Sequence, residues 1–342
     1  MTKIKFAVAG LGRIGKIHLD NMLQMEEVEV VAIMDPSEEC RSYAKNKNIP
    51  FIASSYEDLM AMDEFSAIVI CSPTTTHADY VEIAALAGKN IFCEKPLDLS
   101  QERVLEVLNV VKESGVKLML GFNRRFDKEF KKVHELVKEG AVGDPHLVKI
   151  TSRDPGAPPI SYIEQSGGLF LDMTIHDFDM ARFVVGKEVV EVFAKGAVLT
   201  DPAIGEAGDI DTAVVILTYT DGTMAVIDNS REAAYGYDQR IEVFGSKGMV
   251  QANNNFHDSH RLYTRKGIEA ALPLHFFLER YATAYKMEML EYVKSLINGQ
   301  PVSVDGTDGL SSLQIGLAAI RSLKEKRPVK IEEVNLGMKV KP

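Results

Sequence analysis

KFAVAGLGRIG, residues 5–15, joins an apolar strand to three glycines with Gly-X-Gly-X-X-Gly spacing. An amphipathic segment follows at once, so the pattern predicts a strand, a tight turn and then a helix. The first glycine permits the turn, the second lets a ligand approach the backbone, and the third lets helix and strand pack closely. The helix N-terminus adds free N–H groups and a partial positive charge. We therefore predict a pyrophosphate site for a dinucleotide, formed by Gly10, Gly12, Arg13 and Ile14.

Asp35 is the next feature of this predicted dinucleotide site. It ends the second apolar run about 20 residues after Gly15, where a carboxylate can accept hydrogen bonds from an adenosine ribose. The same charge would repel a 2′-phosphate, so we expect NAD to be preferred and NADP to be less favoured. Arg41 weakens this expected preference for NAD. If its guanidinium folded over the ribose, it could pair with a 2′-phosphate, and NADP could then also bind.

The first part of the chain alternates short apolar runs with amphipathic segments, which is typical of a parallel sheet covered by helices. Right-handed connections between such strands predict a doubly wound Rossmann fold, with ligands at the carboxyl ends of the strands. The expected strands are residues 5–9, 29–34, 67–71, 90–93 and 117–120, and the expected helices are 14–25, 38–46, 77–87 and 101–114.

The pattern changes after Gly121, so we divide the chain into domains at 1–121 and 122–342. Hairpin signals join the β-rich runs 211–219 and 223–230, and also 239–244 and 249–251. With a strand at 189–195, they predict an α+β domain with a large, mostly antiparallel open sheet. A helix at 169–184 should cover one face, and a last helix near 309–324 can pack back on the first domain.

GGLFLDMTIHDFD, residues 167–179, sets Asp172 and His176 four residues apart within that helical pattern. Positions i and i+4 share one helix face, so both side chains are expected to point into one cleft. Asp179 follows one turn later, where it could orient the imidazole. This arrangement suits proton transfer, although a polar helix face with a satisfied histidine has the same pattern.

The composition argues against several other classes of function. The formal net charge is -10 and no dense basic run is present, which disfavours nucleic acid and anionic membranes as partners. No apolar run reaches ~18 residues and no signal-peptide pattern opens the chain, so we expect a cytoplasmic protein. The three cysteines Cys40, Cys71 and Cys93 form no CxxC pair and no short ligand spacing, so we predict no metal site.

Four motifs in this order resemble the Gfo/Idh/MocA family of NAD(P)-dependent oxidoreductases along nearly the whole chain. They are the glycine pattern, SPTTTH at 72–77, EKP at 94–96 and the segment that ends at Asp179. The resemblance implies that the cofactor is also contacted by Ser72, Thr74, His77, Glu94 and Lys95. It further implies that Lys95, Asp172 and His176 are catalytic, with His176 as the base. The peptide before Pro96 is a candidate for the cis form.

Within the family, residues 174–179 and 235–238 look most like the inositol 2-dehydrogenase branch, although many relatives have glycine in place of Thr174. This likeness implies oxidation of a secondary hydroxyl of a cyclic polyol, with myo-inositol, converted to its 2-ketone, as the leading substrate. Arg125, Asp154 and Tyr235 then match positions that contact the polyol, beside Lys95, Asp172 and His176.

Oxidation of a secondary hydroxyl requires groups of the same types. A neutral imidazole can accept the hydroxyl proton, and a lysine ammonium can stabilise the alkoxide. Another inositol isomer, an aldose or an amino sugar is the runner-up substrate. An NAD-dependent glycosidase and a non-catalytic NAD-binding sensor are the alternatives from other classes. The family also implies a homo-oligomer, either a tetramer or a dimer.

Overall fold

The computed structural model describes residues 3–334, which form two compact units. The first unit contains the chain up to Asn123 together with residues 284–311, and the second contains residues 124–283 and the chain from Ser312 onward. The first unit is thus built from two separate parts of the sequence. No helix in the described range has the length and apolar character needed to cross a membrane.

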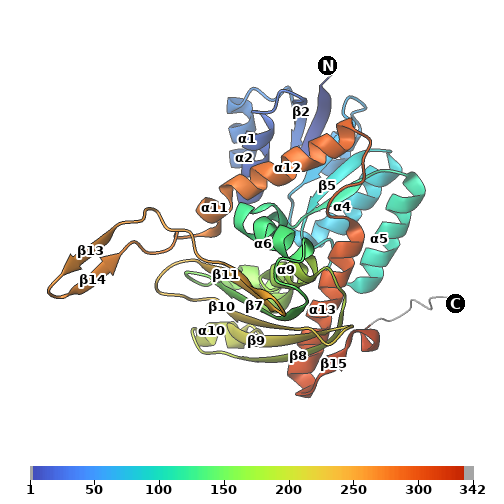
Figure 1. Ribbon diagram of the computed structural model, residues 1–342. Helices are drawn as coiled ribbons and strands as arrows, with labels where there is room; N and C mark the ends of the chain where they lie inside the picture. Colours follow the sequence, from blue (N-terminus) through green and yellow to red (C-terminus); the bar gives the residue numbers. More distant parts are fainter. Residues whose placement is uncertain (1–2, 335–342) are drawn as a thin grey trace. The chain divides into compact units, whose positions relative to one another are not determined.

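A parallel sheet forms the centre of the first unit (Figure 1). It has six strands in the order β3-β2-β1-β4-β5-β6. Its strands are β1 (Ile4–Ala9), β2 (Val28–Met34), β3 (Phe51–Ala53), β4 (Ala67–Ile70), β5 (Asn90–Glu94) and β6 (Leu118–Gly121). The helices are α1 (Arg13–Met22), α2 (Glu38–Asn46), α3 (Tyr56–Met60), α4 (Thr74–Leu86) and α5 (Gln101–Ser114). The strand order reverses between β1 and β4, and ligands bind at the carboxyl edge of such a switch point.

The predicted Rossmann fold is confirmed, and every strand expected in this unit is present. Strand β3 and helix α3 were not predicted. Strand β3 has three residues, of which only Ala53 is buried, so it leaves no apolar run that a sequence pattern could reveal.

Helix α12 (Ala282–Ile297) brings a distant part of the sequence back to this sheet. Its Tyr292 is fully buried and packs edge-on against Phe6 of β1, and it also lies beside Phe92 of β5. Aromatic rings bury large apolar areas, so these contacts account for much of the attachment of α12 to the sheet. The core of the first unit therefore depends on residues more than 150 positions apart in sequence.

The helix expected at 309–324 is observed as α13 (Gly306–Glu325), but it joins the first unit only through its first turns. From Ser312 onward it belongs to the second unit, where Leu171 occupies the space that a Cβ on Gly316 would need. The hydroxyl of Ser322 accepts a hydrogen bond from the Ala194 N–H at 3.0 Å. Thus α12, rather than α13, is the main element that returns to the first unit.

A seven-stranded mixed sheet forms the second unit, in the order β12-β11-β7-β10-β9-β8-β15. Its strands are β7 (Pro145–Arg153), β8 (Val189–Ala197), β9 (Thr212–Tyr219), β10 (Met224–Ser230), β11 (Asp238–Gly245), β12 (Gly248–Ala252) and β15 (Val329–Lys330). Both predicted hairpins, β9–β10 and β11–β12, are present and antiparallel. Strand β7 was not predicted; it separates the hairpins, pairing parallel with β10 and antiparallel with β11.

Helices cover one face of this sheet, among them α6 (Lys128–Lys138) and α9 (Ile175–Val185). Strand β9 shows the asymmetry, because Val215 and Leu217 are buried whereas Val214 and Ile216 are exposed. A strand whose side chains alternate in this way has one packed face and one open face. The expected open sheet is therefore observed.

Shorter elements complete the second unit. They are α7 (Ile160–Ser166), α8 (Gly168–Asp172), α10 (Pro202–Glu206), α11 (Phe277–Arg280) and two 3-10 turns (Asn123–Phe126 and Ile331–Glu333). Strands β13 (Arg261–Thr264) and β14 (Gly267–Ala270) form a hairpin that projects from the sheet, with every residue exposed.

Candidate active site

The glycine turn has the geometry that a dinucleotide needs. Gly10 adopts φ +90°, and a Cβ there would lie 2.6 Å from the Ser72 nitrogen. A Cβ on Gly15 would lie 2.0 Å from the carbonyl oxygen of Gly10, so helix α1 packs directly on the turn. By contrast, a Cβ on Gly12 would meet no protein atom within 4 Å. Gly10 and Gly15 are thus required by the fold, whereas the space at Gly12 is open to a ligand.

The start of α1 supports the same assignment. Gly12 is the N-cap residue, and no side chain caps the helix there. The first turn of α1 begins with Arg13 and Ile14. N–H groups at this end of a helix have no acceptor within the helix itself, and an anion is favoured there. These features fit the pyrophosphate of NAD.

The Asp35 carboxylate stabilises the glycine turn through hydrogen bonds. Its Oδ2 accepts a hydrogen bond from the Leu11 N–H at 2.6 Å, and its Oδ1 accepts one from the Ser37 N–H at 2.8 Å. A carboxylate oxygen has more than one lone pair, so both oxygens can still accept from a ribose hydroxyl. The structure thus adds a stabilising role in the glycine turn to the ribose contact predicted for Asp35.

Arg41 lies close to Asp35 but is held by other groups. Its Nη1 donates to the carbonyl oxygens of Asp35 and Pro36, and its Nε and Nη2 donate to the Glu38 carboxylate. The charge of Glu38 offsets that of the guanidinium, which makes Arg41 a poor partner for a 2′-phosphate. This arrangement agrees with a preference for NAD.

Two turns follow β4 and β5 at the same edge of the sheet, and His77 joins them. Its Nδ1 lies 2.8 Å from the Pro96 carbonyl oxygen, and its Nε2 lies 2.7 Å from the Ser72 carbonyl oxygen. Burial lowers the pKa of His77, although both carbonyls act to raise it, so we treat the ring as neutral. A neutral ring donates one proton, to one carbonyl at a time.

The predicted residues Ser72, Thr74, Glu94 and Lys95 lie in or beside these two turns. Thr74 opens helix α4, and the Ser72 hydroxyl accepts a hydrogen bond from Thr76 at 2.7 Å. Glu94 is the last residue of β5, and Lys95 follows it directly. The peptide between Lys95 and Pro96 is cis.

In the second unit, Asp172 and His176 do not lie on one continuous helix, so that part of the sequence interpretation is wrong. Asp172 is the last residue of α8, and His176 is the second residue of α9. Between the two helices, the Thr174 N–H donates to the Leu169 carbonyl, five residues back, at 2.9 Å. The buried Thr174 hydroxyl donates to Asn229 on β10 at 2.8 Å. This contact with a distant strand holds the break, and local sequence periodicity cannot reveal it.

Asp172 is the centre of a polar cluster. Its Oδ1 accepts a hydrogen bond from the Tyr162 hydroxyl at 2.9 Å, and its Oδ2 accepts a long one from Arg231 Nη1 at 3.4 Å. Arg231, which follows β10, is only 1% exposed, and its Nη2 lies 3.7 Å from Asp209. Sequence analysis missed Tyr162 and Arg231, because they approach Asp172 from different elements. An arginine directly after a predicted strand was the only local signal for Arg231.

Asp154 belongs to the same region. Its N–H donates to the Ser230 carbonyl at the end of β10, next to Arg231 in sequence. Burial raises the pKa of Asp154 to about 7; Arg231 and Arg124 act to lower it, and Asp172 acts to raise it. A raised carboxyl pKa is a feature that Asp154 shares with groups in functional sites.

Arg125 and Asp179 form a buried ion pair. Arg125 Nε donates to one carboxylate oxygen of Asp179 at 2.8 Å, and Nη2 donates to the other. Asp179 is therefore the counterion of Arg125, and its role in orienting His176 stays a prediction. A parallel pair joins Arg124 to Asp177.

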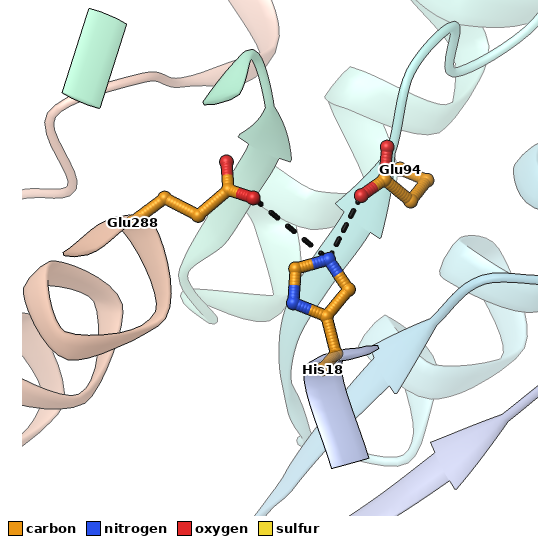
Figure 2. Close-up of side chains that lie close together, drawn as sticks. All are labelled: His18, Glu94 and Glu288. Carbon is orange, nitrogen blue, oxygen red and sulfur yellow. Dashed lines mark hydrogen bonds and ion pairs between the residues drawn. The ribbon is translucent and has the colours of Figure 1, made fainter. Parts of the chain in front are cut away.

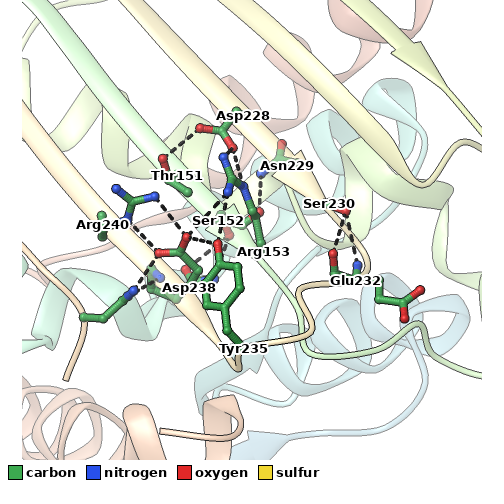
Figure 3. A network of polar contacts seen from close by, with 12 residues as sticks. Thr151, Ser152, Arg153, Asp228, Asn229, Ser230, Glu232, Tyr235, Asp238 and Arg240 are labelled. Atoms are coloured by element: carbon green, nitrogen blue, oxygen red, sulfur yellow. Dashed lines mark hydrogen bonds and ion pairs between the residues drawn. The ribbon is translucent and has the colours of Figure 1, made fainter. Parts of the chain in front are cut away.

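Tyr235 lies in a different polar network, on the open face of the sheet (Figure 3). Its hydroxyl donates to Asp238 at 2.6 Å and accepts from Arg153 Nη1 at 3.1 Å. Arg153 also pairs with Asp228, and these residues line a hollow of about 510 Å³ together with Val214. The contacts of Tyr235 thus differ from those of Asp172.

Comparison with known proteins agrees with this geometry. The model of the oxidoreductase family with an NAD-binding Rossmann fold matches residues 4–122, and the Gfo/Idh/MocA C-terminal domain model matches residues 130–251. A myo-inositol 2-dehydrogenase of Thermotoga maritima is 48% identical over 97% of this chain and 99% of its own length. An inositol 2-dehydrogenase of Rhizobium meliloti is 47% identical over 96% and 99%.

A solved structure gives the same result. The scyllo-inositol dehydrogenase of Lactobacillus casei, crystallised with NAD(H) and scyllo-inositol, has a TM-score of 0.91 and 32% identity, covering 97% of this chain and 100% of that one. The resemblance seen in the sequence motifs is confirmed. The chain therefore belongs to the Gfo/Idh/MocA family of oxidoreductases, and its first unit is the NAD-binding Rossmann domain of that family.

Proposed function

We propose that this protein oxidises a secondary hydroxyl of a cyclic polyol, with myo-inositol as substrate and its 2-ketone as product. The observation that carries the proposal is the 47–48% identity, over nearly the whole chain, to two dehydrogenases named for inositol. The polar cluster around Asp172 supports it, because a substrate with many hydroxyls needs several donors and acceptors rather than one fixed charge.

The proposed chemistry assigns a separate role to each of the candidate residues. The glycine turn and Asp35 would hold NAD, which would supply the hydride acceptor when bound. His176 takes the hydroxyl proton, and the Lys95 ammonium stabilises the negative charge that develops on the oxygen. Asp172, held by Tyr162 and Arg231, accepts a hydrogen bond from a substrate hydroxyl. Asp154 holds a second hydroxyl.

Two of the predicted substrate contacts take another role in this proposal. Arg125 is engaged by Asp179 through both carboxylate oxygens, and the Tyr235 hydroxyl is engaged by Asp238 and Arg153. We assign Arg125 and Tyr235 to the support of the site, because each already has charged partners.

Net formation of NADH with a panel of inositol isomers, aldoses, amino sugars and glycosides tests the proposal, with NAD and NADP in parallel. We expect the highest kcat/KM with myo-inositol and NAD, and a value at least about tenfold lower with NADP, because Asp35 repels a 2′-phosphate. Activity restricted to aldoses would contradict the substrate. Cleavage of glycosides without net NADH, or no reaction at all, would favour the glycosidase or the sensor.

A second inositol isomer is the leading alternative substrate. The scyllo-inositol dehydrogenase of Lactobacillus casei shares the fold of this chain at 32% identity. The two isomers differ in the orientation of one hydroxyl, so a higher kcat/KM with scyllo-inositol than with myo-inositol would move the assignment to that branch.

We also propose that the open face of the second sheet is covered by a second copy of this chain, in a dimer or tetramer. Val214, Ile216, Met224 and Phe244 expose apolar side chains on this sheet. Light scattering should give a mass of two or four chains, and Ile216→Lys with Met224→Lys should lower it, because charges on an apolar interface oppose association. A monomeric wild type would contradict this assembly.

We also propose that the protein is located in the cytoplasm. Its cysteines are free, which is typical of proteins in a reducing compartment.

A further inference from the structure

Three ionisable side chains meet inside the first unit (Figure 2). His18 lies on α1, Glu94 ends β5, and Glu288 lies on the returning helix α12. The Nε2 atom of His18 is 2.9 Å from a carboxylate oxygen of Glu94 and 3.8 Å from one of Glu288. His18 and Glu288 are fully buried. This cluster joins the helix of the glycine turn, the strand that leads to Lys95, and the segment that closes the core.

The carboxylate of Glu94 is held from two sides. His18 Nε2 makes a hydrogen bond to it, and Gly121 lies opposite Glu94 in the register of β5 and β6. A Cβ on Gly121 would come within 2.9 Å of this carboxyl group, so the missing side chain leaves the space that the carboxylate fills. Since Lys95 is the next residue, a fixed Glu94 side chain also restrains the start of the Lys95 turn.

Glu288 has an unusual environment for a carboxyl group. Neither of its oxygens has a hydrogen-bond partner within the part of the chain that the structure describes. Tyr285, one turn earlier on α12, packs edge-on against the His18 ring, and His18 also packs against Phe92. An ionised carboxylate without partners is costly in such surroundings, so the neutral acid is favoured. Burial, and then the charge of Glu94, raise the pKa of Glu288 well above its usual range.

We propose that His18 and Glu288 are positioning residues, which together fix the carboxylate of Glu94 and thereby the strand end that presents Lys95. This inference rests on the proposed role of Lys95. His18 donates from Nε2 to Glu94, and Glu288 packs behind this contact as an uncharged acid. Glu94 is then the single anion of the cluster, and the hydrogen bond from His18 is directed to it alone.

Three further ionisable side chains lie on or next to the elements that carry the cluster or pack beside it. Cys71 follows β4, Cys93 lies on β5 and Tyr292 lies on α12. Burial raises the pKa of all three groups well above their usual range, which keeps them neutral.

The same three side chains are also of the types that bind a divalent metal ion. A metal-bound histidine normally donates its other ring N–H to an acceptor. His18 Nδ1 has no hydrogen-bond partner in the described residues, which is unfavourable for a metal ligand and acceptable for a neutral ring that donates from Nε2. We therefore favour a hydrogen bond from His18 to Glu94 over a bound metal ion. The metal content of the protein is one outcome of the test.

Kinetics of His18 variants test the positioning role. His18→Gln keeps an N–H donor near the position of Nε2 and should stay within about threefold of wild-type kcat. His18→Leu removes the donor and should lower kcat by about tenfold to a hundredfold. Gly121→Ala places a methyl group against the other side of the same carboxylate, so it should lower kcat by a similar factor.

Two results in an active wild type would overturn the proposal: normal kcat in both His18→Leu and Gly121→Ala, or equal losses in His18→Gln and His18→Leu. Absence of activity in the wild type on the whole substrate panel is a different result, because it would refute the proposed function. The charge of Glu288 needs a measurement that does not use activity.

Thermal unfolding against pH supplies that measurement. An acid whose folded pKa lies above its ordinary 4.5 stabilises the protein most at low pH, and this stability is lost as the pH rises toward the folded value. Glu288→Gln is neutral throughout, so its Tm should exceed that of the wild type increasingly between about pH 5 and pH 8. Glu291→Gln, on the exposed side of the same helix, is the control and should show no such trend. A lower Tm for Glu288→Gln at every pH, or stoichiometric zinc that this variant loses, would overturn the assignment.

Discussion

Replacement of Lys95 or His176 by alanine is expected to lower kcat by about two to four orders of magnitude, while NAD still binds. Lys95→Ala removes the ammonium that stabilises the alkoxide, and His176→Ala removes the group that takes the hydroxyl proton. Neither change touches the glycine turn. Steady-state kinetics with the best polyol of the panel give kcat, and calorimetry with NAD gives the cofactor affinity.

Matched controls come from exposed residues of the same types. Lys112 lies near the end of α5, and His257 lies in the segment before the β13–β14 hairpin. Alanine at either position should leave kcat within about twofold of wild type, because exposed side chains away from a site contribute little. Near-normal turnover in both Lys95→Ala and His176→Ala would refute the catalytic assignment, whatever the substrate.

Gly15→Ala is expected to destabilise the protein and to abolish NAD binding, whereas Gly12→Ala should weaken NAD binding without loss of stability. The Cβ of an alanine at Gly15 would lie 2.0 Å from the Gly10 carbonyl oxygen, so the turn and helix α1 must move apart. We expect a loss of about 3 kcal/mol or more in the free energy of unfolding. Denaturant titration and calorimetry with NAD measure the two effects.

Gly12→Ala is the matched partner of this prediction. Gly12 has φ -62°, which alanine tolerates, and its Cβ would meet no protein atom within 4 Å. The added methyl group enters only the space assigned to the pyrophosphate, so the KM for NAD should rise about tenfold or more with an unchanged free energy of unfolding. Equal effects of the two substitutions on stability would show that the turn has another geometry.

The parts of the fold that sequence could predict are those fixed by neighbours in the chain. The glycine turn, Asp35 and the strands of the first unit follow from local spacing and apolar runs. Strand β7 was missed because its place is fixed by pairing with β10 and β11, which follow it by more than 60 residues. Long-range pairing of this kind leaves little trace in local periodicity.

The same distinction applies to the site. Asp172 and His176 were recognised as a pair, but the helix break between them depends on the contact of Thr174 with Asn229 on β10. Arg231 reaches Asp172 from the end of that same strand, and Glu288 reaches His18 from a helix in a distant part of the chain. Sequence motifs identified the residues proposed to act on the substrate, and only the folded structure revealed the residues that hold them in place.

The hydrogen bonds that Asp35 accepts from the glycine turn and from Ser37 limit which substitutions can change the preference for NAD over NADP. The carboxylate predicted to contact the ribose is also the acceptor for the Leu11 and Ser37 N–H groups, so the same side chain stabilises the shape of the loop. A substitution at Asp35 that admits a 2′-phosphate would leave two backbone donors without an acceptor. Redesign toward NADP is therefore better begun at Glu38, whose removal would release Arg41 toward the ribose while the loop keeps its hydrogen bonds to Asp35.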